Sequence, residues 1–266
     1  MPTPPRSPRL AVVTGASAGI GLALARLVAR AGRPVLAVAR RGERLEALAA
    51  EASREGWAPI HPLALDVAAP EAAEAIRARA GALGGAGWVV NNAGLGQYGR
   101  FAEADPRRLV ELVRVNCEAV VLVSRAFVAD LRAGGGGTIL NVASAAAFQP
   151  TPYMAVYGGT KAFVLSFTEA LAEELRGTGV RAGAFCPGPV ETEFGAVAGT
   201  GNRFERPPGI LTAEEAAREA LRQLERGEVV RVPHPIYKLT AAASRLIPRA
   251  VLRRASGRIH RPAEET

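Results

Sequence analysis

Residues 10–21 read LAVVTGASAGIG, an apolar run that leads through a glycine-rich turn into a longer segment. The apolar run predicts a buried strand, and the segment after it carries apolar residues three and four positions apart, which predicts a helix. Glycines in such a turn let backbone N–H groups approach a pyrophosphate at the helix N-terminus. We therefore predict a nucleotide-binding turn over residues 14–21. The alternative is a loop whose small residues only allow close packing of helix and strand.

The same alternation of strand and helix continues along the chain. Further strands are predicted at 34–39, 60–65, 87–91, 137–143 and 180–186, after a first strand at 9–14. Most are nearly continuous apolar runs, as expected for parallel strands covered by helices on both faces. A helix is predicted from a capping box, Thr212 with Glu215, to about Arg226. The fold class is α/β: a single-domain, Rossmann-like, doubly wound parallel sheet that binds ligands at the carboxyl ends of its strands.

Composition excludes several classes of protein. The chain has 266 residues, of which 48% are hydrophobic and 22% charged, so it is not a disordered, collagenous or disulfide-scaffold chain. Two cysteines, Cys117 and Cys186, and three histidines support neither a disulfide framework nor a zinc site. The N-terminal apolar run is too short for a signal peptide, and no run reaches the roughly 18 apolar residues of a membrane span. We expect a protein of the reducing cytoplasm.

The net charge of +8 is concentrated at the C-terminus. Residues 229–266 carry a net charge of +6, so the rest of the chain is close to neutral. Because the basic residues are confined to this tail and no aromatic residues interleave with them, we do not expect nucleic-acid binding. We divide the chain into a disordered segment at 1–8, a dinucleotide-binding domain at 9–232 and a basic amphipathic extension at 233–266.

Apolar residues at helical spacing characterise the extension, with arginines repeating every four residues. Pro248 should break or kink this helix. Two interpretations remain open. The apolar face docks on the body of the protein or on a second subunit, or the helix rests weakly on an anionic membrane surface. The apolar positions are Leu239, Ala243, Leu246, Ile247 and Ala250, and the basic ones are Arg245, Arg249 and Arg253.

Further candidate residues follow the predicted strands. Arg40 and Arg41 stand after the second strand, where a carboxylate would be expected for a free ribose 2′-OH, and an arginine there can pair with a 2′-phosphate. This favours NADP(H) over NAD(H); the alternative is a solvated basic helix start. Asp66-Val67 ends the third strand and Asn91-Asn92-Ala93-Gly94 the fourth, although Asp66 could equally cap a helix.

Tyr157 and Lys161 lie four residues apart and therefore share one helix face. A nearby ammonium lowers the pKa of a phenol, which gives a usable proton donor and acceptor. The alternative is a surface lysine beside a half-buried tyrosine.

Taken together, these motifs resemble the short-chain dehydrogenase/reductase family over about residues 9–232. TGASAGIG matches its TGxxxGxG, NNAG matches unchanged, and Tyr157 with Lys161 matches YxxxK. Asn116 falls at the helix asparagine, Ser144 precedes Tyr157 by the customary thirteen residues, and CPGPVET at 186–192 matches the PG segment. The resemblance implies the catalytic residues Asn116, Ser144, Tyr157 and Lys161. It implies cofactor contacts at Gly15, Ser17, Ala18, Gly19, Ile20, Gly21, Arg40, Arg41, Asp66, Val67, Asn92, Ala93, Gly94, Tyr157, Lys161, Pro187, Gly188, Val190 and Thr192.

The resemblance also implies a role for each group. Tyr157 exchanges a proton with the substrate oxygen, which Ser144 holds, while Lys161 lowers the Tyr157 pKa and contacts the nicotinamide ribose. Asn116 anchors a water that relays protons. Asp66 and Val67 contact the adenine, Val190 and Thr192 the carboxamide, and Asn92 and Gly94 line the trough. The cofactor supplies the hydride chemistry. Relatives pair through helices that begin near Pro106 and Tyr157, so we expect a homodimer or homotetramer.

Two regions allow more than one interpretation. Gly158 and Gly159 are unusual inside a helix, and they indicate either close packing on a second subunit or tolerated drift. Residues 194–210 read as a mobile lid over the substrate, in which Arg203 and Arg206 could meet an anionic tail. We expect an NADP(H)-dependent carbonyl reductase acting on an apolar ketone. The alternatives are a 3-oxoacyl thioester reductase of lipid metabolism and a non-catalytic NADP(H)-binding regulator.

Overall fold

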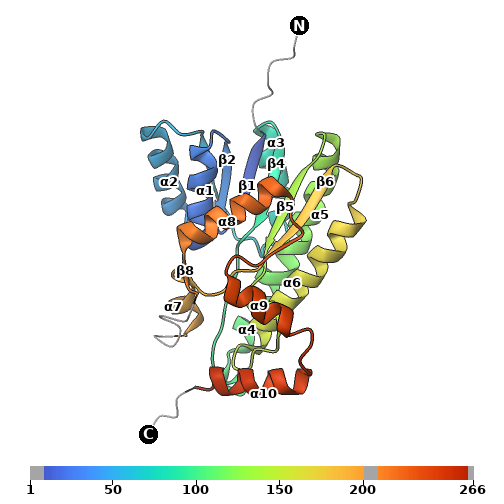
Figure 1. Cartoon of the computed structure of the whole chain (residues 1–266). Helices are drawn as coiled ribbons and strands as arrows, with labels where there is room; N and C mark the ends of the chain where they lie inside the picture. Colours follow the sequence, from blue (N-terminus) through green and yellow to red (C-terminus); the bar gives the residue numbers. More distant parts are fainter. Residues whose placement is uncertain (1–8, 201–208, 263–266) are drawn as a thin grey trace.

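The computed structural model describes residues 9–200 and 209–262. A seven-stranded, all-parallel sheet in the order β3-β2-β1-β4-β5-β6-β9 forms its centre (Figure 1). The strands of this sheet are β1 (Leu10–Thr14), β2 (Val35–Ala39), β3 (Ile60–Ala64), β4 (Ala86–Asn91), β5 (Gly137–Val142), β6 (Val180–Phe185) and β9 (Val230–Arg231). The predicted doubly wound α/β fold is therefore confirmed, and each of the six predicted strands is present.

Three short strands have no counterpart among the predicted ones. The seventh strand of the sheet, β9, pairs only through Val230 and Arg231, and β7 (Val190–Glu191) pairs with β8 (Leu211–Thr212) in a separate two-stranded sheet. Two-residue strands leave no apolar run for periodicity to detect. The predicted lid falls partly outside the described residues: 194–200 contain α7 (Phe194–Ala198), whereas Arg203 and Arg206 lie outside, as does the predicted disorder of residues 1–8.

Helices cover both faces of the sheet. Alternate residues along β1 and β2 point to opposite sides, so Ala11 and Val35 pack in the cluster with α1 and α8, and Val12 and Leu36 in the cluster with α3 and α5. The main helices are α1 (Gly19–Arg30), α2 (Gly42–Arg54), α3 (Ala72–Ala82), α4 (Pro106–Val113), α5 (Ala119–Ala133), α6 (Ala155–Glu174) and α8 (Ala213–Arg226). Short 3-10 helices occupy Phe101–Glu103 (η1) and Ala145–Phe148 (η3).

The capping box predicted at the start of α8 is present. Glu215 N–H donates to Thr212 Oγ1 at 3.2 Å, and Thr212 N–H donates to Glu215 Oε2 at 2.9 Å. The helix ends at Arg226, as predicted, because Gly227 takes a left-handed conformation with φ 68°.

The C-terminal extension forms two helices, α9 (Pro235–Ala243) and α10 (Arg249–His260), separated at Pro248 as predicted. Both lie below the sheet in the view of Figure 1, beyond the carboxyl ends of the strands. One interpretation is that the apolar face of the extension docks on the body of the protein. It is wrong for the large side chains of that face, since Leu239 is 71% and Leu246 87% exposed. The extension packs instead through Ala241 and Ser256, which are buried.

Candidate active site

The two loops at the centre of the sheet are bonded to each other. Thr14, at the end of β1, accepts the N–H groups of Asn92 and Ala93 on its Oγ1 at 3.0 and 3.1 Å, and Asn92 Nδ2 donates to Thr14 O at 2.8 Å. Gly15 follows with φ 68°, and a Cβ there would lie 2.8 Å from Asn92 Nδ2. This position therefore requires glycine for both its conformation and its contact. The glycine-rich turn and the NNAG segment meet where the strand order reverses, as the fold class predicts.

The N-terminus of α1 is suited to an anion. Its N-cap, Ala18, contributes no side-chain hydrogen bond, and its first turn contains no acidic residue. The backbone N–H groups of Gly19, Ile20 and Gly21 begin a helix whose dipole favours a negative charge. Thr192 lies beside this turn, because its Cγ2 would be 3.0 Å from a Cβ on Gly19.

Arg40 and Arg41 have different partners. Arg40 Nη1 lies 3.2 Å from Glu111 Oε1 and 3.9 Å from Asp66 Oδ2. Arg41 Nε donates to Ser17 Oγ of the turn at 3.1 Å, so of these two arginines it is Arg41 that is bonded to the turn. Asp66, for which a cofactor contact is predicted, lines an open cavity of about 510 Å³ together with Glu111.

A carboxylate that sequence reasoning missed lies against the arginines. Glu193 accepts from Arg41 Nη1 at 2.7 Å and from Arg44 Nη1 at 2.6 Å. Hydrogen bonds from Arg41 and then Arg44 are the main causes that lower the pKa of Glu193 below its usual value. No local pattern could reveal this arrangement, because about 150 residues separate the partners.

Asp66 does not cap the following helix, which was the structural alternative. Its Oδ1 accepts Ala68 N–H at 3.0 Å, whereas α3 begins at Ala72 with Glu71 at its N-cap. Asp66 therefore shapes the turn after β3. Its neighbour Val67 packs against the apolar cluster that contains Leu112 and Val115.

Tyr157 and Lys161 both lie in α6, and β5 and α6 bring the other catalytic candidates close to them. Lys161 is 5% exposed, and its Nζ donates to Val142 O, the last residue of β5, at 2.7 Å. The same Nζ lies 5.9 Å from the centroid of the Tyr157 ring. The structural alternative of a surface lysine is excluded, because the ammonium is buried.

The pKa values of the two side chains respond mainly to burial. Burial raises the pKa of Tyr157 above its usual value, and a hydrogen bond with the Ser144 side chain opposes that rise. The net direction is thus opposite to the lowering expected from the sequence, because desolvation of the phenolate outweighs the other effects. Burial also lowers the pKa of Lys161 to about 8, which the Cys117 and Cys186 thiols partly oppose.

Asn116 lies in a single turn of π-helix, Arg114–Glu118 (η2), between α4 and α5. Its Oδ1 accepts Leu95 N–H at 2.8 Å, and its Nδ2 donates to Leu95 O at 2.9 Å and to Thr160 Oγ1 at 3.0 Å. The side-chain amide therefore ties the segment after β4 to α6. The π-turn, of a kind often found at functional sites, had no signal in the sequence.

Two of the catalytic candidates, Asn116 and Lys161, meet at Gly94. A Cβ on this residue would lie 3.5 Å from both Asn116 Oδ1 and Lys161 Nζ. Ser144 follows β5 and caps η3, with its Oγ accepting Ala146 N–H at 3.1 Å. The carboxyl ends of β4 and β5, the π-turn and α6 thus bring all four predicted catalytic residues to one region.

The segment after β6 lies against the same region. Pro187 O accepts Ala145 N–H at 2.8 Å, which links the PG segment to the loop that carries Ser144. Further along, the ring of Phe194 lies 5.4 Å from that of Tyr157. Ala198 O accepts Tyr98 N–H at 2.8 Å. Phe194 is a further residue of the candidate site that sequence reasoning did not single out.

The two glycines after Tyr157 have different surroundings. Gly158 is buried, and a Cβ there would lie 2.8 Å from Thr151 Oγ1 of the same chain. Gly159 is exposed, and a Cβ there would meet no atom of the described residues within 4 Å. Packing within the chain therefore explains Gly158, whereas only Gly159 is free to contact a second subunit.

These features fit a nicotinamide dinucleotide better than a metal ion. The turn, the uncapped start of α1 and the adjoining arginines offer N–H groups and positive charge to phosphates, and the buried ammonium of Lys161 lies at the other end. Among residues 9–200 and 209–262, no group of three or more His, Cys, Asp or Glu side chains could hold a metal ion. In the same ranges, none of the helices is long and apolar enough to cross a membrane.

Comparison with known proteins agrees with this geometry. The sequence model of short chain dehydrogenases matches residues 9–202. A short chain dehydrogenase of Pseudocercospora fijiensis is 34% identical over 229 residues, covering 85% of this chain and 72% of the relative. The structure resembles a short-chain dehydrogenase from Sphingobium yanoikuyae in complex with NADPH, with TM-score 0.79, 29% identity, and 97% and 98% of the two chains covered. It also resembles the bulky-bulky ketone specific alcohol dehydrogenase from Comamonas testosteroni, with TM-score 0.76, 29% identity, and 92% and 96% covered. The chain belongs to the short-chain dehydrogenase family.

Proposed function

We propose that this chain is an NADP(H)-dependent oxidoreductase that interconverts a ketone and a secondary alcohol, with Tyr157 as the general acid and base. The observation that carries the proposal is that Lys161 and Asn116 meet beside Gly94, while Tyr157 lies next to Lys161 and hydrogen-bonds Ser144. A bound nicotinamide dinucleotide would supply or accept the hydride. The protein's own residues hold the substrate oxygen and move its proton.

Tyr157 is the proton donor in the direction of ketone reduction. Burial raises its pKa, so the phenol is protonated at neutral pH and ready to donate. The Ser144 hydroxyl hydrogen-bonds the phenol and offers a second contact to the substrate oxygen. In the oxidative direction the Tyr157 phenolate accepts the proton of the substrate hydroxyl. The phenolate must therefore be stabilised.

Lys161 provides that stabilisation. Its pKa is about 8, so at neutral pH the buried ammonium is charged and lies on the Tyr157 side of α6. Asn116 acts by position, because its amide is already hydrogen-bonded to Leu95 and Thr160. It fixes the segment next to Gly94.

The preference for NADP(H) is supported by the positive charge next to the turn. Arg41 donates a hydrogen bond to Ser17, and both Arg41 and Arg44 donate to Glu193, so the two guanidinium groups lie side by side. Together they can receive a 2′-phosphate. The two residues directly after β2 are Arg40 and Arg41, so no carboxylate stands there to receive a free 2′-OH. The similar structure from Sphingobium yanoikuyae, described in complex with NADPH, supports the same cofactor.

An apolar ketone is the proposed substrate. The ring of Phe194 beside Tyr157, and the buried cluster with Leu95 against which Tyr157 packs, make this region apolar. The similar alcohol dehydrogenase from Comamonas testosteroni, named for bulky-bulky ketones, agrees with that choice.

The direct test is turnover of ketones with each cofactor. The purified protein is mixed with NADPH or NADH and a panel of apolar ketones and β-ketoacyl thioesters, and oxidation of the cofactor is followed by fluorescence. The proposal expects ketone reduction with NADPH at higher kcat/KM than with NADH. Saturation by thioesters alone would favour a 3-oxoacyl thioester reductase. Binding of NADPH without turnover of any carbonyl compound or alcohol would favour a regulator.

We propose that the chain assembles as a homodimer or homotetramer through α4, α5 and α6. These helices expose Val110 (51%), Val113 (44%), Leu122 (42%) and Phe163 (42%), large apolar side chains that a second copy can cover. Sedimentation velocity tests this, and Val110→Glu should shift the protein to a smaller species.

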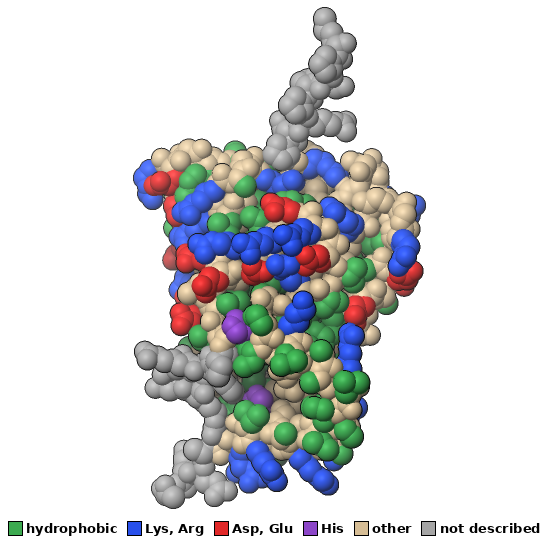
Figure 2. Space-filling model, in the orientation of Figure 1, with side chains coloured by type: hydrophobic (Ala, Val, Ile, Leu, Met, Phe, Trp, Pro, Cys, Tyr) green, Lys and Arg blue, Asp and Glu red, His purple; other side chains and the backbone are tan. Residues whose placement is uncertain are grey.

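We also propose weak contact of the extension with an anionic membrane surface. Residues 233–262 contain seven lysines and arginines and no acidic residue, and they expose Leu239 (71%), Leu246 (87%) and Val251 (53%). Figure 2 shows hydrophobic side chains gathered over the lower part of this face, with basic side chains at its lower edge. Co-sedimentation with vesicles that contain an anionic lipid at low salt tests the proposal, and absence of binding would contradict it.

A further inference from the structure

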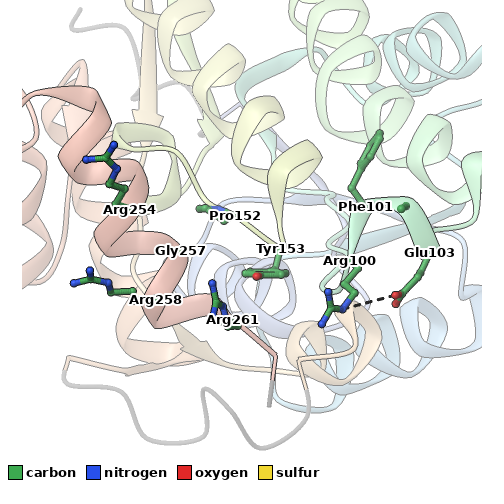
Figure 3. Close-up of a pocket in the computed structure, with 10 residues that line it drawn as sticks. Arg100, Phe101, Glu103, Pro152, Tyr153, Arg254, Gly257, Arg258 and Arg261 are labelled. Carbon is green, nitrogen blue, oxygen red and sulfur yellow. Dashed lines mark ion pairs between the residues drawn. The ribbon is translucent and has the colours of Figure 1, made fainter. Parts of the chain in front are cut away.

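A second cavity lies between the C-terminal extension and the loops next to the candidate active site. It is open, has a volume of about 680 Å³, and is bounded by α10, η1 and the segment before α6. Figure 3 shows Tyr153 between Arg100 and Arg261, with Arg254 and Arg258 along α10. Neither the family motifs nor the proposed reaction uses these residues.

The cavity has an excess of positive charge. Four arginines line it, whereas Glu103 is the single acidic residue among its lining residues and pairs with Arg100 at 3.7 Å. Within the described ranges, 9–200 and 209–262, no carboxylate forms an ion pair with Arg254, Arg258 or Arg261. Three guanidinium groups with no ion-pairing carboxylate among the described residues favour an anion from solution.

The cavity walls are continuous with the catalytic segments. Tyr153 stands four residues before Tyr157, so their Cα atoms are no more than about 15 Å apart. Gly99 N–H donates to Tyr153 O at 2.9 Å, which joins the cavity wall to the segment that begins at Gly94. Tyr98 Oη donates to His260 O at 2.9 Å and holds α10 against the same segment. The cavity wall at Tyr153 is therefore within about 15 Å of Tyr157, a distance that an elongated molecule can span.

The cavity also offers apolar contacts. The ring of Tyr153 is held by a backbone with φ 64°, the only positive value for a non-glycine residue in the described part of the chain. Phe101 is 66% exposed at the cavity wall, and Pro152 packs near Gly257 of α10. Aromatic and proline surfaces beside guanidinium groups suit an apolar body that ends in an anionic group.

We propose that this cavity binds the anionic end of an elongated carbonyl substrate, whose carboxylate, sulfonate or phosphate contacts the arginines of α10 while its ketone lies at Tyr157. The inference rests on the proposed reaction and names a substrate class for it. It predicts that the protein distinguishes a keto acid from its neutral ester by chain length, because only an acid of sufficient length reaches the arginines.

The test uses methyl ketones of increasing chain length with a terminal carboxylate, each beside its methyl ester, with NADPH as the cofactor. The expected result is a ratio of acid to ester kcat/KM near one for short chains that rises to about fivefold or more once the chain spans the distance. Reduction of every acid and ester with no dependence on charge at any length would overturn this inference and leave the proposed reaction standing. Turnover of none of them would count against the proposed reaction itself.

Matched variants locate the effect. Arg254→Gln/Arg258→Gln removes two charges from the cavity, and Arg245→Gln/Arg249→Gln removes two from the same extension outside it. The cavity variant should abolish the preference for the long acid through KM and leave the ester unchanged, whereas the control should keep the preference. Equal loss in both variants would overturn the inference, because it would indicate a general effect of net charge.

A lipid headgroup offers the same anionic chemistry, and a vesicle assay separates the two sources. The assay compares the parent, the two double variants and a variant that lacks all four charges. Binding to vesicles that contain an anionic lipid should fall equally in the two double variants. Vesicle binding that depends on Arg254 and Arg258 alone, with no preference for soluble acids, would assign the cavity to lipid and overturn the proposal.

Discussion

Arg41 and Glu193 form an ion pair with Nη1 and Oε2 2.7 Å apart, although 152 positions separate them in the sequence. The pair joins the start of α2, next to the glycine-rich turn, to the residue that precedes Phe194. Because Phe194 packs against Tyr157, a single carboxylate connects the proposed 2′-phosphate site with the wall of the candidate active site. Glu193 is exposed, so its effect depends on salt.

Arg41 should be the main determinant of cofactor preference. Arg41→Ala removes a guanidinium that bonds to the turn, so we expect the Kd for NADPH to rise about tenfold and the Kd for NADH to stay unchanged. Fluorescence titration with both cofactors measures this. Arg54→Ala, at the exposed end of α2, is the control and should change neither Kd. An equal effect of Arg41→Ala on both cofactors would contradict the assignment.

Glu193 should weaken NADPH binding. Its carboxylate competes with a phosphate for Arg41 and Arg44, so Glu193→Gln is expected to lower the Kd for NADPH severalfold, with a smaller effect at high salt. The matched control is Glu191→Gln, since Glu191 is also exposed but forms no ion pair within the described ranges. Weaker NADPH binding in Glu193→Gln would show that the carboxylate orients the arginines instead.

Alanine substitutions at Gly158 and Gly159 of α6 should change the free energy of unfolding in opposite directions. Gly158→Ala brings a Cβ to 2.8 Å from Thr151 Oγ1 and should lower the free energy of unfolding by about 1–3 kcal/mol. Gly159→Ala meets open space and should raise it by about 1 kcal/mol. Chemical denaturation measures both. If Gly159→Ala also dissociates the oligomer in sedimentation, α6 packs on a second subunit at this residue.

Lys161 should contribute a rise in stability with pH between pH 8 and pH 9. The pKa of Lys161 is lowered to about 8 in the fold, whereas the unfolded chain keeps this proton until about pH 10.4. At this site the unfolded state therefore binds more protons in this window, and Lys161 alone should increase the free energy of unfolding by up to about 1 kcal/mol. Burial raises the pKa of Cys186 and of Cys117 in the fold, whereas unfolded thiols ionise from about pH 8.5, so these two groups lower the free energy of unfolding as the pH rises in the same window.

Denaturation at several pH values compares the parent with Lys161→Met. The variant has no proton to release at this position, so between pH 8 and pH 9 its free energy of unfolding should fall relative to that of the parent by up to about 1 kcal/mol. The same slope in both proteins would mean that Lys161 is not the group responsible.

Much of the fold could be predicted from local sequence, because buried parallel strands are continuous apolar runs and glycine turns have a required chemistry. The stretch 10–21, the capping box at Thr212 and the break at Pro248 are examples. The two-residue strand β9 could not be predicted, since its pairing depends on Ala184 of the neighbouring strand β6 rather than on its own sequence pattern.

The candidate site could be predicted in part for a similar reason. Tyr157 and Lys161 lie one helical turn apart, so their relation is local. The ion pair of Glu193 and the contact between Gly158 and Thr151 depend on tertiary packing, which no spacing rule describes. The pKa of Tyr157 depends on burial, and burial outweighed the effect expected from its neighbour.

The most direct test of the proposed chemistry is Tyr157→Phe, assayed for NADPH binding and for ketone reduction in the same preparation. Removal of the phenolic proton donor should lower kcat by about 100-fold or more, while the Kd for NADPH stays within about twofold of the parent. A variant that binds NADPH normally and keeps most of its turnover would contradict the central claim, because another group would then donate the proton.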